Sequence, residues 1–451
     1  MAWFKACLII YFPKTFNVIP FLRMPFKGRI MHSCILIMLC LQLHAQYSNQ
    51  TDTLHISLLQ AEKIFLDSNL SVLAAHYNVD AALAQVMQAK YWDNPVFHTD
   101  QVVMANHNFL PYKKLPDGSP GAQYFIGIDQ LIKTAGKRGK LIAAAQTNTA
   151  ISKLQLQDVV RKLRSQLHID YYTIARSLGS YNFYRQQQAQ LNTLLAAMQQ
   201  QLDAGNISQK DYLQLQSLVV LLKQDMIDVG SDMADAEADL KTLLHINSNV
   251  FIKPDINSMP QVLLPEDASI LIEQAKQNNP YYQMQQQQTI YQQQMLAYQK
   301  ALRVPDVTIT PNYDRLSNYA PDYFGIGVSL PLPLFNKNKG NIQSASAAVQ
   351  QQQAIQSNAE TELQNNVVNA YNKLKLALTL NTPEQQQFVQ RYESLYQSMF
   401  NSYKARQVSF LEFINFFNDY KDLQDKLLQQ QLNLALATDA LNYETGIDVI
   451  K

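Results

Sequence analysis

One short segment occurs twice in this chain, and the duplication constrains the fold more than any other feature of the sequence. Ala204-Gly205-Asn206-Ile207-Ser208, with Asp211 shortly after, is matched by Ala405-Arg406-Gln407-Val408-Ser409 with Glu412. The correspondence continues upstream in the same order, from Ser68-Asn69 against Asn278-Asn279 to Tyr124-Phe125-Ile126-Gly127 against Tyr323-Phe324-Gly325-Ile326-Gly327. Solenoid repeats have periods of roughly 20–50 residues, whereas this unit has the size of a domain. The sequence therefore predicts two similar, pseudo-symmetric halves.

Residues 1–45 have the features of an N-terminal extension followed by a secretory signal peptide. Lys27 and Arg29 precede an apolar run over 34–41, and Ala45 provides a small residue at the cleavage point. The apolar run is too short for a permanent transmembrane helix.

All three cysteines, Cys7, Cys34 and Cys40, fall within this N-terminal segment. Cleavage would leave a mature chain without disulfides or thiol chemistry. Lipidation at Cys40 is the alternative, but Leu39 is larger than the residue that usually precedes a lipidated cysteine.

Charge and composition exclude several classes of protein. The formal net charge is +1 at pH 7, and no basic block marks a nucleic-acid-binding surface. Glutamine runs at 285–288 and 350–353 indicate long polar helices, with low-complexity disorder as the alternative. After residue 46 no stretch of about 20 apolar residues exists, so the mature chain is not expected to be a helical membrane protein. The much weaker strand signal of a β-barrel remains compatible with it.

Two strand–loop–strand segments occupy matching places in the halves. Residues 95–106 and 124–133 flank a loop rich in proline and glycine, and 305–314 and 323–334 repeat the arrangement. Each strand has about the 9–11 residues that a tilted membrane strand requires. Pro331 and Pro333 are expected to mark the exit from the sheet. Aromatic residues accompany these strands, as interfacial girdles or as ordinary sheet residues: Trp92, Phe97, Tyr112, Tyr124, Phe125, Tyr313, Tyr319, Tyr323 and Phe324.

Helical patterns fill the remainder of each half. Residues 57–68 and 71–92 are predicted helices, and 139–204 and 340–405 predict rods of about 100 Å each. The first rod carries a coiled-coil-like seam, and the second is interrupted at Asn381-Thr382-Pro383. Gly179 and Pro383 predict a kink or a broken turn in their respective rods. The seam residues are Leu156, Val160, Leu163, Leu167, Tyr171 and Ile174.

Each rod is predicted to turn at the duplicated segment and to return as a second helix. Ser208 and Ser409 are good N-cap residues, and Asp211 and Glu412 stand at N3, as in a capping box. The returning helices are expected over 209–245 and 410–445. The chain then divides into a first repeat at 46–245, with its β-hairpin at about 95–133 and its tip turn at 204–208, an extended connector at 246–266, and a second repeat at 267–451. The second repeat has its β-hairpin at about 305–334 and its tip turn at 405–409.

Catalysis finds no support in the sequence. The histidines of the mature chain are scattered without metal-ligand spacing, and there is no phosphate-binding glycine loop or nucleophile elbow. We therefore expect no enzyme activity, no catalytic residue, no cofactor and no metal site. His168, on the long helix, is interpreted as a surface or seam residue. The histidines are His55, His76, His98, His107, His168 and His245.

Four membrane-length strands set the expected oligomeric state. The smallest bacterial barrels use eight strands, and an open sheet edge in lipid is prohibitively costly. If the strands span a membrane, the chain must oligomerise. Three copies supply twelve strands and twelve helical rods, enough to surround an aqueous channel.

The complete order of elements resembles the TolC family of outer-membrane efflux channels, over essentially the whole mature chain. Gly205, Ser208 and Asp211 are similar to that family's tip pattern, as are Ser409 and Glu412 in the second copy, whereas Arg406 stands where glycine is usual. Segments 136–139 and 330–340 are similar to those of the CzcC/CusC-like heavy-metal branch. The implied fold is α+β and mostly α, with a duplicated unit of long coiled-coil helices forming a periplasmic tunnel and four β-strands per protomer closing a 12-stranded barrel in a homotrimer.

The resemblance also implies a function and partners. It implies a channel in the outer membrane of a Gram-negative bacterium, in contact with lipid, a periplasmic adaptor and an inner-membrane RND pump, exporting metal ions, drugs or dyes. Asp211 and Glu412 would lie at the pore entrance, where repeated carboxylates focus cations, or would merely cap their helices. Gln214 and Asn415 stand where a second acidic ring might occur. The remaining tip residues would contact the adaptor: Gly205, Asn206, Ile207, Ser208, Arg406, Gln407, Val408 and Ser409.

Two alternatives stay open from the sequence. One is the outer-membrane component of a type I protein-secretion system. The other, from a different class, is a soluble periplasmic coiled-coil adaptor without membrane strands.

Overall fold

The computed structural model describes residues 52–101, 103–105, 107–109, 118, 124–246, 249–255, 262–265, 267–316, 320–380 and 382–450. The predicted extension and signal peptide, all three cysteines, Tyr112 and Tyr319 lie outside these residues.

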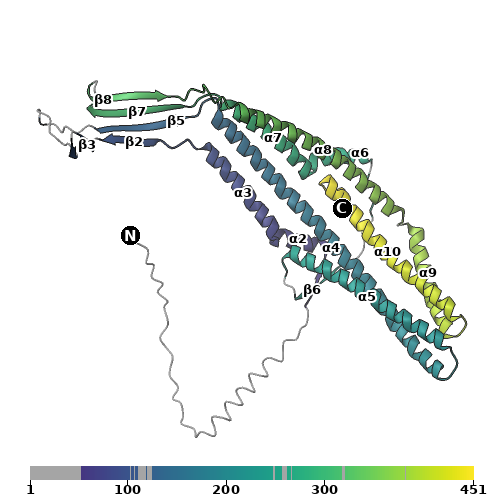
Figure 1. Ribbon diagram of the computed structural model, residues 1–451. Helices are drawn as coiled ribbons and strands as arrows, with labels where there is room; N and C mark the ends of the chain where they lie inside the picture. The colour runs from purple at the N-terminus through teal and green to yellow at the C-terminus, as the bar shows by residue number, and fades with distance from the viewer. Residues whose placement is uncertain are drawn as a thin grey trace, which may run out of the picture. The chain divides into compact units, whose positions relative to one another are not determined.

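A four-stranded antiparallel sheet contains the two predicted hairpins. Its order is β2 (Val96–Gln101), β5 (Tyr124–Ile132), β7 (Val307–Leu316), β8 (Pro321–Ser329), so β5 and β7 join the hairpins edge to edge (Figure 1). β8 ends before Pro331 and Pro333, as predicted, because proline has no N–H to give to the ladder. A short pair, β3 (Met104–Ala105) and β4 (Asn108–Phe109), was not predicted.

Shorter helices are interrupted at matching asparagines. α2 (Leu58–Ser68) is followed by α3 (Leu70–Lys90), and α6 (Ala268–Asn278) by α7 (Pro280–Ala301). The side-chain oxygens of Asn69 and Asn279 cap α3 and α7, accepting from the second and third following amides at 2.9–3.2 Å. Their amide groups donate to Leu243 O and Glu444 O, both at 2.9 Å. The two corresponding asparagines therefore form the same kind of helix junction in each repeat, called here an asparagine joint.

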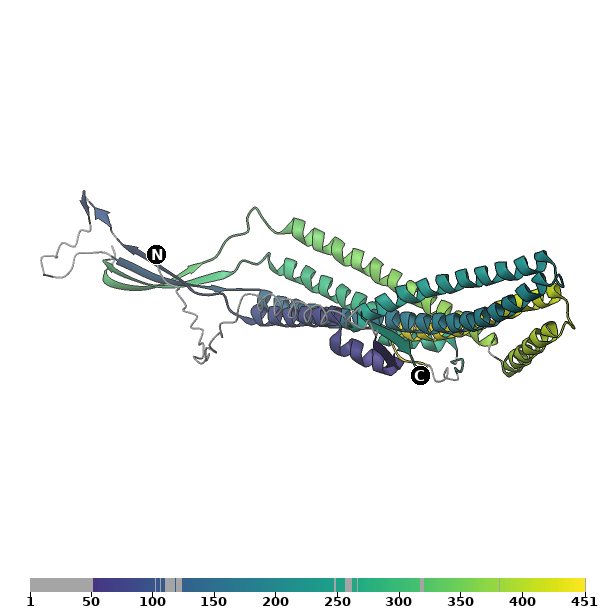
Figure 2. The same ribbon diagram turned by 90° about the horizontal axis from the view of Figure 1, so that it is seen from below.

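The first long rod is a single helix. α4 (Lys137–Asp203) has 67 residues and continues through Gly179 without interruption, over about 100 Å. Figure 2 shows the long helices between the sheet and the tips. The predicted kink at Gly179 is wrong. Leu428 Cδ2 lies 3.1 Å from where a Cβ would be, so the glycine permits close approach of another helix. α5 (Gln209–Leu244) returns from the tip.

The second rod is broken where proline predicts. α8 (Lys339–Thr379) stops, and α9 (Pro383–Lys404) begins with Thr382 as N-cap, its side chain accepting from Gln385 N at 3.3 Å. Proline is acceptable at the first helical position, since the missing N–H would have no partner there. α10 (Phe410–Thr445) returns from the second tip. No helix among the described residues is long and apolar enough to cross a membrane.

Three apolar cores hold the helices together. The first joins α2, α4 and α5 with the two-stranded pair β1 (Asp52–Ile56) and β6 (Val250–Pro254). It contains the predicted seam, because Leu167, Tyr171 and Ile174 are buried and the other seam residues pack against them. The second core lies in the two helical hairpins, α4–α5 and α9–α10. The third core joins α6, α7, α8 and α10.

Candidate functional site at the helical tips and the sheet

The two tip turns, 204–208 and 405–409, have the same backbone structure. In the first, Gly205 N donates to Leu202 O at 2.9 Å and Asn206 N to Gln201 O at 2.8 Å. In the second, Arg406 N donates to Tyr403 O and Gln407 N to Ser402 O, both at 2.9 Å. These bonds satisfy the last carbonyls of α4 and α9 and require a left-handed residue after the helix. The duplicated sequence thus encodes a duplicated turn.

Arg406 occupies the left-handed position that glycine fills in the first turn. Its φ is +61°, against +73° for Gly205. A residue with a Cβ pays roughly 1–2 kcal/mol in this conformation. The Arg406 guanidinium donates to Gln201 Oε1, which also accepts from Asn206 Nδ2 at 3.1 Å. The arginine therefore links its own turn to the other turn of the same protomer.

The helices that leave the tips are capped by the predicted serines. Ser208 Oγ accepts from Asp211 N at 3.1 Å, and Ser409 Oγ accepts from Glu412 N at 3.3 Å. The full capping box, with a reciprocal side-chain bond, forms elsewhere, between Ser57 and Gln60. At both tips the structure has only the serine half of the box, so the two carboxylates are not used as reciprocal caps.

A groove of about 570 Å³ separates the tips within one protomer. Asp211 and Lys404 line it, whereas the exposed Glu412 does not. Burial, together with the nearby Asp211 carboxylate, raises the pKa of Tyr403 on the opposite wall. Sequence reasoning missed Gln201 and, apart from Val408, the groove's apolar wall, which comes from both helical hairpins, α4–α5 and α9–α10. That wall contains Leu194, Met198, Phe400, Tyr403, Val408 and Phe410.

The four-stranded sheet has two chemically different faces. Directly opposed residues of antiparallel strands share a face, so the register sorts the side chains. Phe324, Ile326 and Val328 are 81%, 77% and 66% exposed, as expected for a surface that needs an apolar environment. Their face also holds Phe97, Thr99, Tyr124, Ile126, Ile128, Gln130, Ile309, Pro311 and Tyr313. The other face holds His98, Asp100, Asp129, Thr308, Thr310, Asn312, Asp314, Gly325, Gly327 and Ser329, with Val96, Phe125, Leu131 and Tyr323.

Three of the aromatic residues that accompany the strands form a cluster on the apolar face. Tyr124 and Tyr313 have ring centroids 6.0 Å apart, and Tyr313 and Phe324 are 5.1 Å apart. Arg315 Cζ lies 5.7 Å from the Tyr124 ring. Phe125 and Tyr323 belong to the polar face, so they are not part of this cluster.

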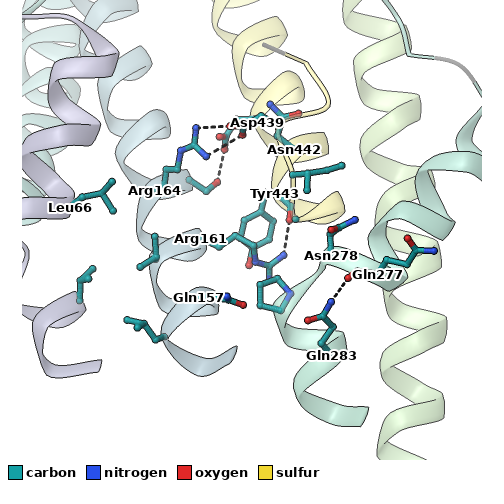
Figure 3. Close-up of a pocket in the computed structure, with 18 of the residues that line it drawn as sticks. Leu66, Gln157, Arg161, Arg164, Gln277, Asn278, Gln283, Asp439, Asn442 and Tyr443 are labelled. Carbon is teal, nitrogen blue, oxygen red and sulfur yellow. Dashed lines mark hydrogen bonds and ion pairs between the residues drawn. The ribbon is translucent and has the colours of Figure 1, made fainter. Parts of the chain in front are cut away.

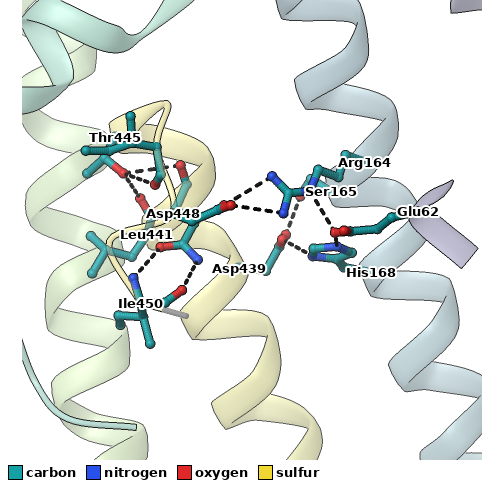
Figure 4. Close-up of polar contacts among 11 residues, drawn as sticks. Glu62, Arg164, Ser165, His168, Asp439, Leu441, Thr445, Asp448 and Ile450 are labelled. Atoms are coloured by element: carbon teal, nitrogen blue, oxygen red, sulfur yellow. Dashed lines mark hydrogen bonds and ion pairs between the residues drawn. The ribbon is translucent and has the colours of Figure 1, made fainter. Parts of the chain in front are cut away.

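A cluster of charged side chains joins the two repeats near the C-terminal end of α10 (Figure 4). His168 of α4 donates from Nε2 to Glu62 Oε1 at 2.6 Å and from Nδ1 to Asp439 Oδ1 at 2.5 Å. Arg164 binds Glu62 at 2.7 Å and Asp448 through two bonds of 3.1 Å. Burial alone would lower the pKa of His168, but the bonds to both carboxylates outweigh it and raise the pKa to about 9. His168 is not a surface residue, since its side chain is 12% exposed and lies between α2, α4 and α10, which agrees with the other alternative, a seam residue.

A cleft of about 950 Å³ adjoins this cluster, between α3, α4, α10 and the α6–α7 junction (Figure 3). The Arg161 guanidinium in this cleft is held by several neighbours. Arg161 Nη1 donates to Tyr443 O at 2.6 Å, its guanidinium carbon lies 3.9 Å from the Tyr443 ring, and Nη2 contacts Asp158 at 2.7 Å. Within the described ranges, no group of three or more His, Cys, Asp or Glu residues is arranged to hold a metal ion.

Comparison with known proteins places this architecture in a known class. Residues 63–244 and 271–443 match the family described as "Outer membrane efflux protein". The chain belongs to this family. The predicted TolC-type fold, the efflux-channel function and the location in the outer membrane of a Gram-negative cell, with a large periplasmic portion, are thereby confirmed. The soluble-adaptor alternative is wrong.

Individual relatives agree with the assignment. The cobalt-zinc-cadmium resistance protein CzcC of Cupriavidus metallidurans is 22% identical over 320 residues, covering 69% of this chain and 71% of that protein. The Campylobacter jejuni CmeC outer membrane channel has a TM-score of 0.72 at 12% identity, over 87% of both chains. A structure of CusC, described in terms of transmembrane channel formation, has a TM-score of 0.70 at 16% identity, over 88% of this chain and 94% of that one.

Proposed function

We propose that this protein is the homotrimeric exit duct of a tripartite efflux system that exports divalent metal cations. The single observation that carries the trimer is the sheet, which has an apolar face and two edge strands, β2 and β8, with no further strand beside them among the described residues. Unpaired strand edges are not tolerated in lipid. Joining β8 of one copy to β2 of the next satisfies these edges, and three copies make a closed sheet of twelve strands. The apolar face then contacts lipid and the polar face lines the duct.

The tip turns are the proposed entrance and docking surface. α4 runs from β5 to the first tip, so the tips lie about 100 Å from the sheet. A periplasmic adaptor, coupled to an inner-membrane RND pump, would contact the exposed residues of both turns and the groove between them. Asp211 and Glu412 would form the cation-focusing entrance, with Asp211 inside the groove and Glu412 exposed beside it.

The proposed cargo rests on chemistry and on one relative. CzcC is named for cobalt, zinc and cadmium resistance, and the polar face of the sheet presents carboxylates and an imidazole. We expect the protein itself to perform no reaction, in keeping with its membership of a family of efflux proteins. The domain division also stays a proposal, supported by the two family matches at 63–244 and 271–443. Export of a protein substrate is the remaining alternative.

The experiment combines native mass spectrometry with single-channel recording. The full-length protein should run as a trimer and should conduct in planar bilayers. Glu412→Lys and Asp211→Lys should each alter conductance and reduce preference for cations, whereas Asp235→Lys, exposed on the same return helix as Asp211, should not. A monomer would overturn the trimer, and unchanged currents in both tip variants would remove the entrance role. Metal accumulation in a deletion strain separates metal export from protein secretion.

A further inference from the structure

Two potential metal ligands meet on the polar face of the sheet. His98 of β2 pairs in register with Gly127 of β5, and Asp129 lies two residues further along β5 on the same face. His98 Nδ1 is 3.5 Å from Asp129 Oδ2, and their side chains are 37% and 36% exposed. Nδ1 itself is enclosed and makes no hydrogen bond to any described residue. An enclosed ring nitrogen without a partner is unusual in a folded protein.

The geometry suits a cation better than it suits a hydrogen bond. A separation of 3.5 Å exceeds the ordinary hydrogen-bond range. Two ligands at about 2.0–2.2 Å from a tetrahedral Zn²⁺ are about 3.3–3.6 Å apart. A small movement would therefore place both atoms in the coordination shell of one divalent ion.

Neighbouring residues hold both ligands in place. Thr310 Oγ1 donates to Asp129 Oδ1 at 2.5 Å, which orients the carboxylate and leaves Oδ2 toward the imidazole. The His98 ring stacks on Phe125 with centroids 5.4 Å apart. It also lies directly over Gly127, where any Cβ would collide with the imidazole. Contacts that fix the orientation of the ligating side chains are typical of built ligand sites.

The surroundings are electrostatically favourable for a cation. Asp100 and Asp314 lie on the same face, on either side of Phe125 in the register. The strand residues that share this face in β2, β5, β7 and β8 include no lysine or arginine. Carboxylates that line a narrow aqueous passage raise the local concentration of cations.

We propose that His98 Nδ1 and Asp129 Oδ2 form a two-ligand site for a first-row divalent cation, completed by water, inside the membrane part of the duct. The inference rests on the proposed function, which turns this face toward the lumen. Three such sites, one per protomer, would form a ring. Two protein ligands give weak, rapidly exchanging binding, and a conducting pathway requires binding weak enough to release the ion.

The test uses the full-length trimer in planar bilayers with KCl and added Zn²⁺. Wild-type current should fall reversibly with Zn²⁺ and recover with EDTA. His98→Gln and Asp129→Asn should each raise the half-blocking Zn²⁺ concentration at least about tenfold, since each removes one of two ligands. His55→Gln, which removes an exposed histidine on β1, should leave the block unchanged. Equal block in wild type and both ligand variants would overturn the site.

A second measurement distinguishes a failure of the proposed metal site from a failure of the proposed channel function. Calorimetry of the detergent-solubilised protein should give about one Zn²⁺ per chain, lost in His98→Gln and retained in His55→Gln. Wild-type protein that conducts without binding Zn²⁺ would refute the site and leave the channel standing. Protein that binds Zn²⁺ but never conducts would refute the proposed function and retain the site. Native mass spectrometry verifies that each variant still forms the wild-type trimer.

Discussion

The two helical hairpins share a turn but differ in what lies beneath it. In the α4–α5 hairpin the buried contacts are mostly aliphatic, from residues such as Leu191, Leu215 and Leu222. In the α9–α10 hairpin they are aromatic. Tyr396 stacks on Tyr420 with centroids 4.2 Å apart, and Tyr403 on Phe413 at 4.9 Å.

The two helical hairpins also differ in whether the helix that leads to the tip is continuous. α4 reaches its tip as one helix, anchored along its length by α3, α5, α7 and α10. α9 is separated from α8 at Thr382 and packs chiefly on α10. A 22-residue segment separated from its rod packs on fewer helices than α4 does, and aromatic side chains bury the most area per residue. The comparison shows that local turn signals were preserved between the repeats while the cores diverged.

The largest expected effect comes from the aromatic core. Tyr396→Ala removes a fully buried ring and its bond to Gln187 Oε1 at 2.6 Å, and should cost about 3–5 kcal/mol. Limited proteolysis should then cleave within 383–404. Leu191→Ala, at an equally buried aliphatic site, should lower the thermal midpoint without opening α9. Tyr396→Phe should lose about 1 kcal/mol. Identical cleavage patterns for the two alanine variants would show that the aromatic contacts do not hold α9 more than the aliphatic contacts do.

The charged cluster on α4 gives a pH-dependent difference that α8 does not share. The pKa of His168 is raised to about 9 from an ordinary 6.5, so its stabilisation is complete below pH 6.5 and is lost as the pH rises through 9. The loss should be on the order of 2–3 kcal/mol. Thermal midpoints of wild type and His168→Gln, measured between pH 6 and 9.5, should converge at high pH. Parallel curves would show that the imidazolium does not stabilise the fold.

The smallest effects should appear at the tips. Gly205→Ala forces a Cβ into the left-handed position and should cost about 1 kcal/mol. Arg406→Gly should be nearly neutral, within about 0.5 kcal/mol, because relief of backbone strain offsets the lost bond to Gln201. A double-mutant cycle with Gln201→Ala measures the link directly. No coupling between Arg406 and Gln201 would show that the two turns are not joined.

Sequence reasoning succeeded where the determinants are local. Serine caps, the break before Pro383 and the alternation in 124–131 depend on nearby residues, and each is present in the structure. The prediction of a kink at Gly179 was wrong because this glycine makes room for Leu428 of another helix, a contact that the local sequence does not reveal. The His168 cluster was missed for the same reason, since its partners lie 106 and 271 residues away. Aromatic residues at 388, 392, 396 and 400 did carry a helical spacing that would have identified the second core.

Part of the sheet site could also have been inferred. The alternation places Asp129 and Gly127 on one face of β5, but only the register with β2 brings His98 beside them. A one-residue slip would move His98 to the opposite face. The ligand pair therefore depends on strand pairing, which the sequence pattern left open.

The asparagine joints have a consequence for chain assembly. Asn69 fastens to Leu243, 174 residues later, and Asn279 fastens to Glu444, 165 residues later. All residues of the first joint have been synthesised before the second repeat begins at residue 267. A chain truncated just before Glu444 retains the first joint and forfeits the second. Such a truncation removes only the last two residues of α10 and the segment after them, so the second joint is completed only when almost the whole chain has been synthesised.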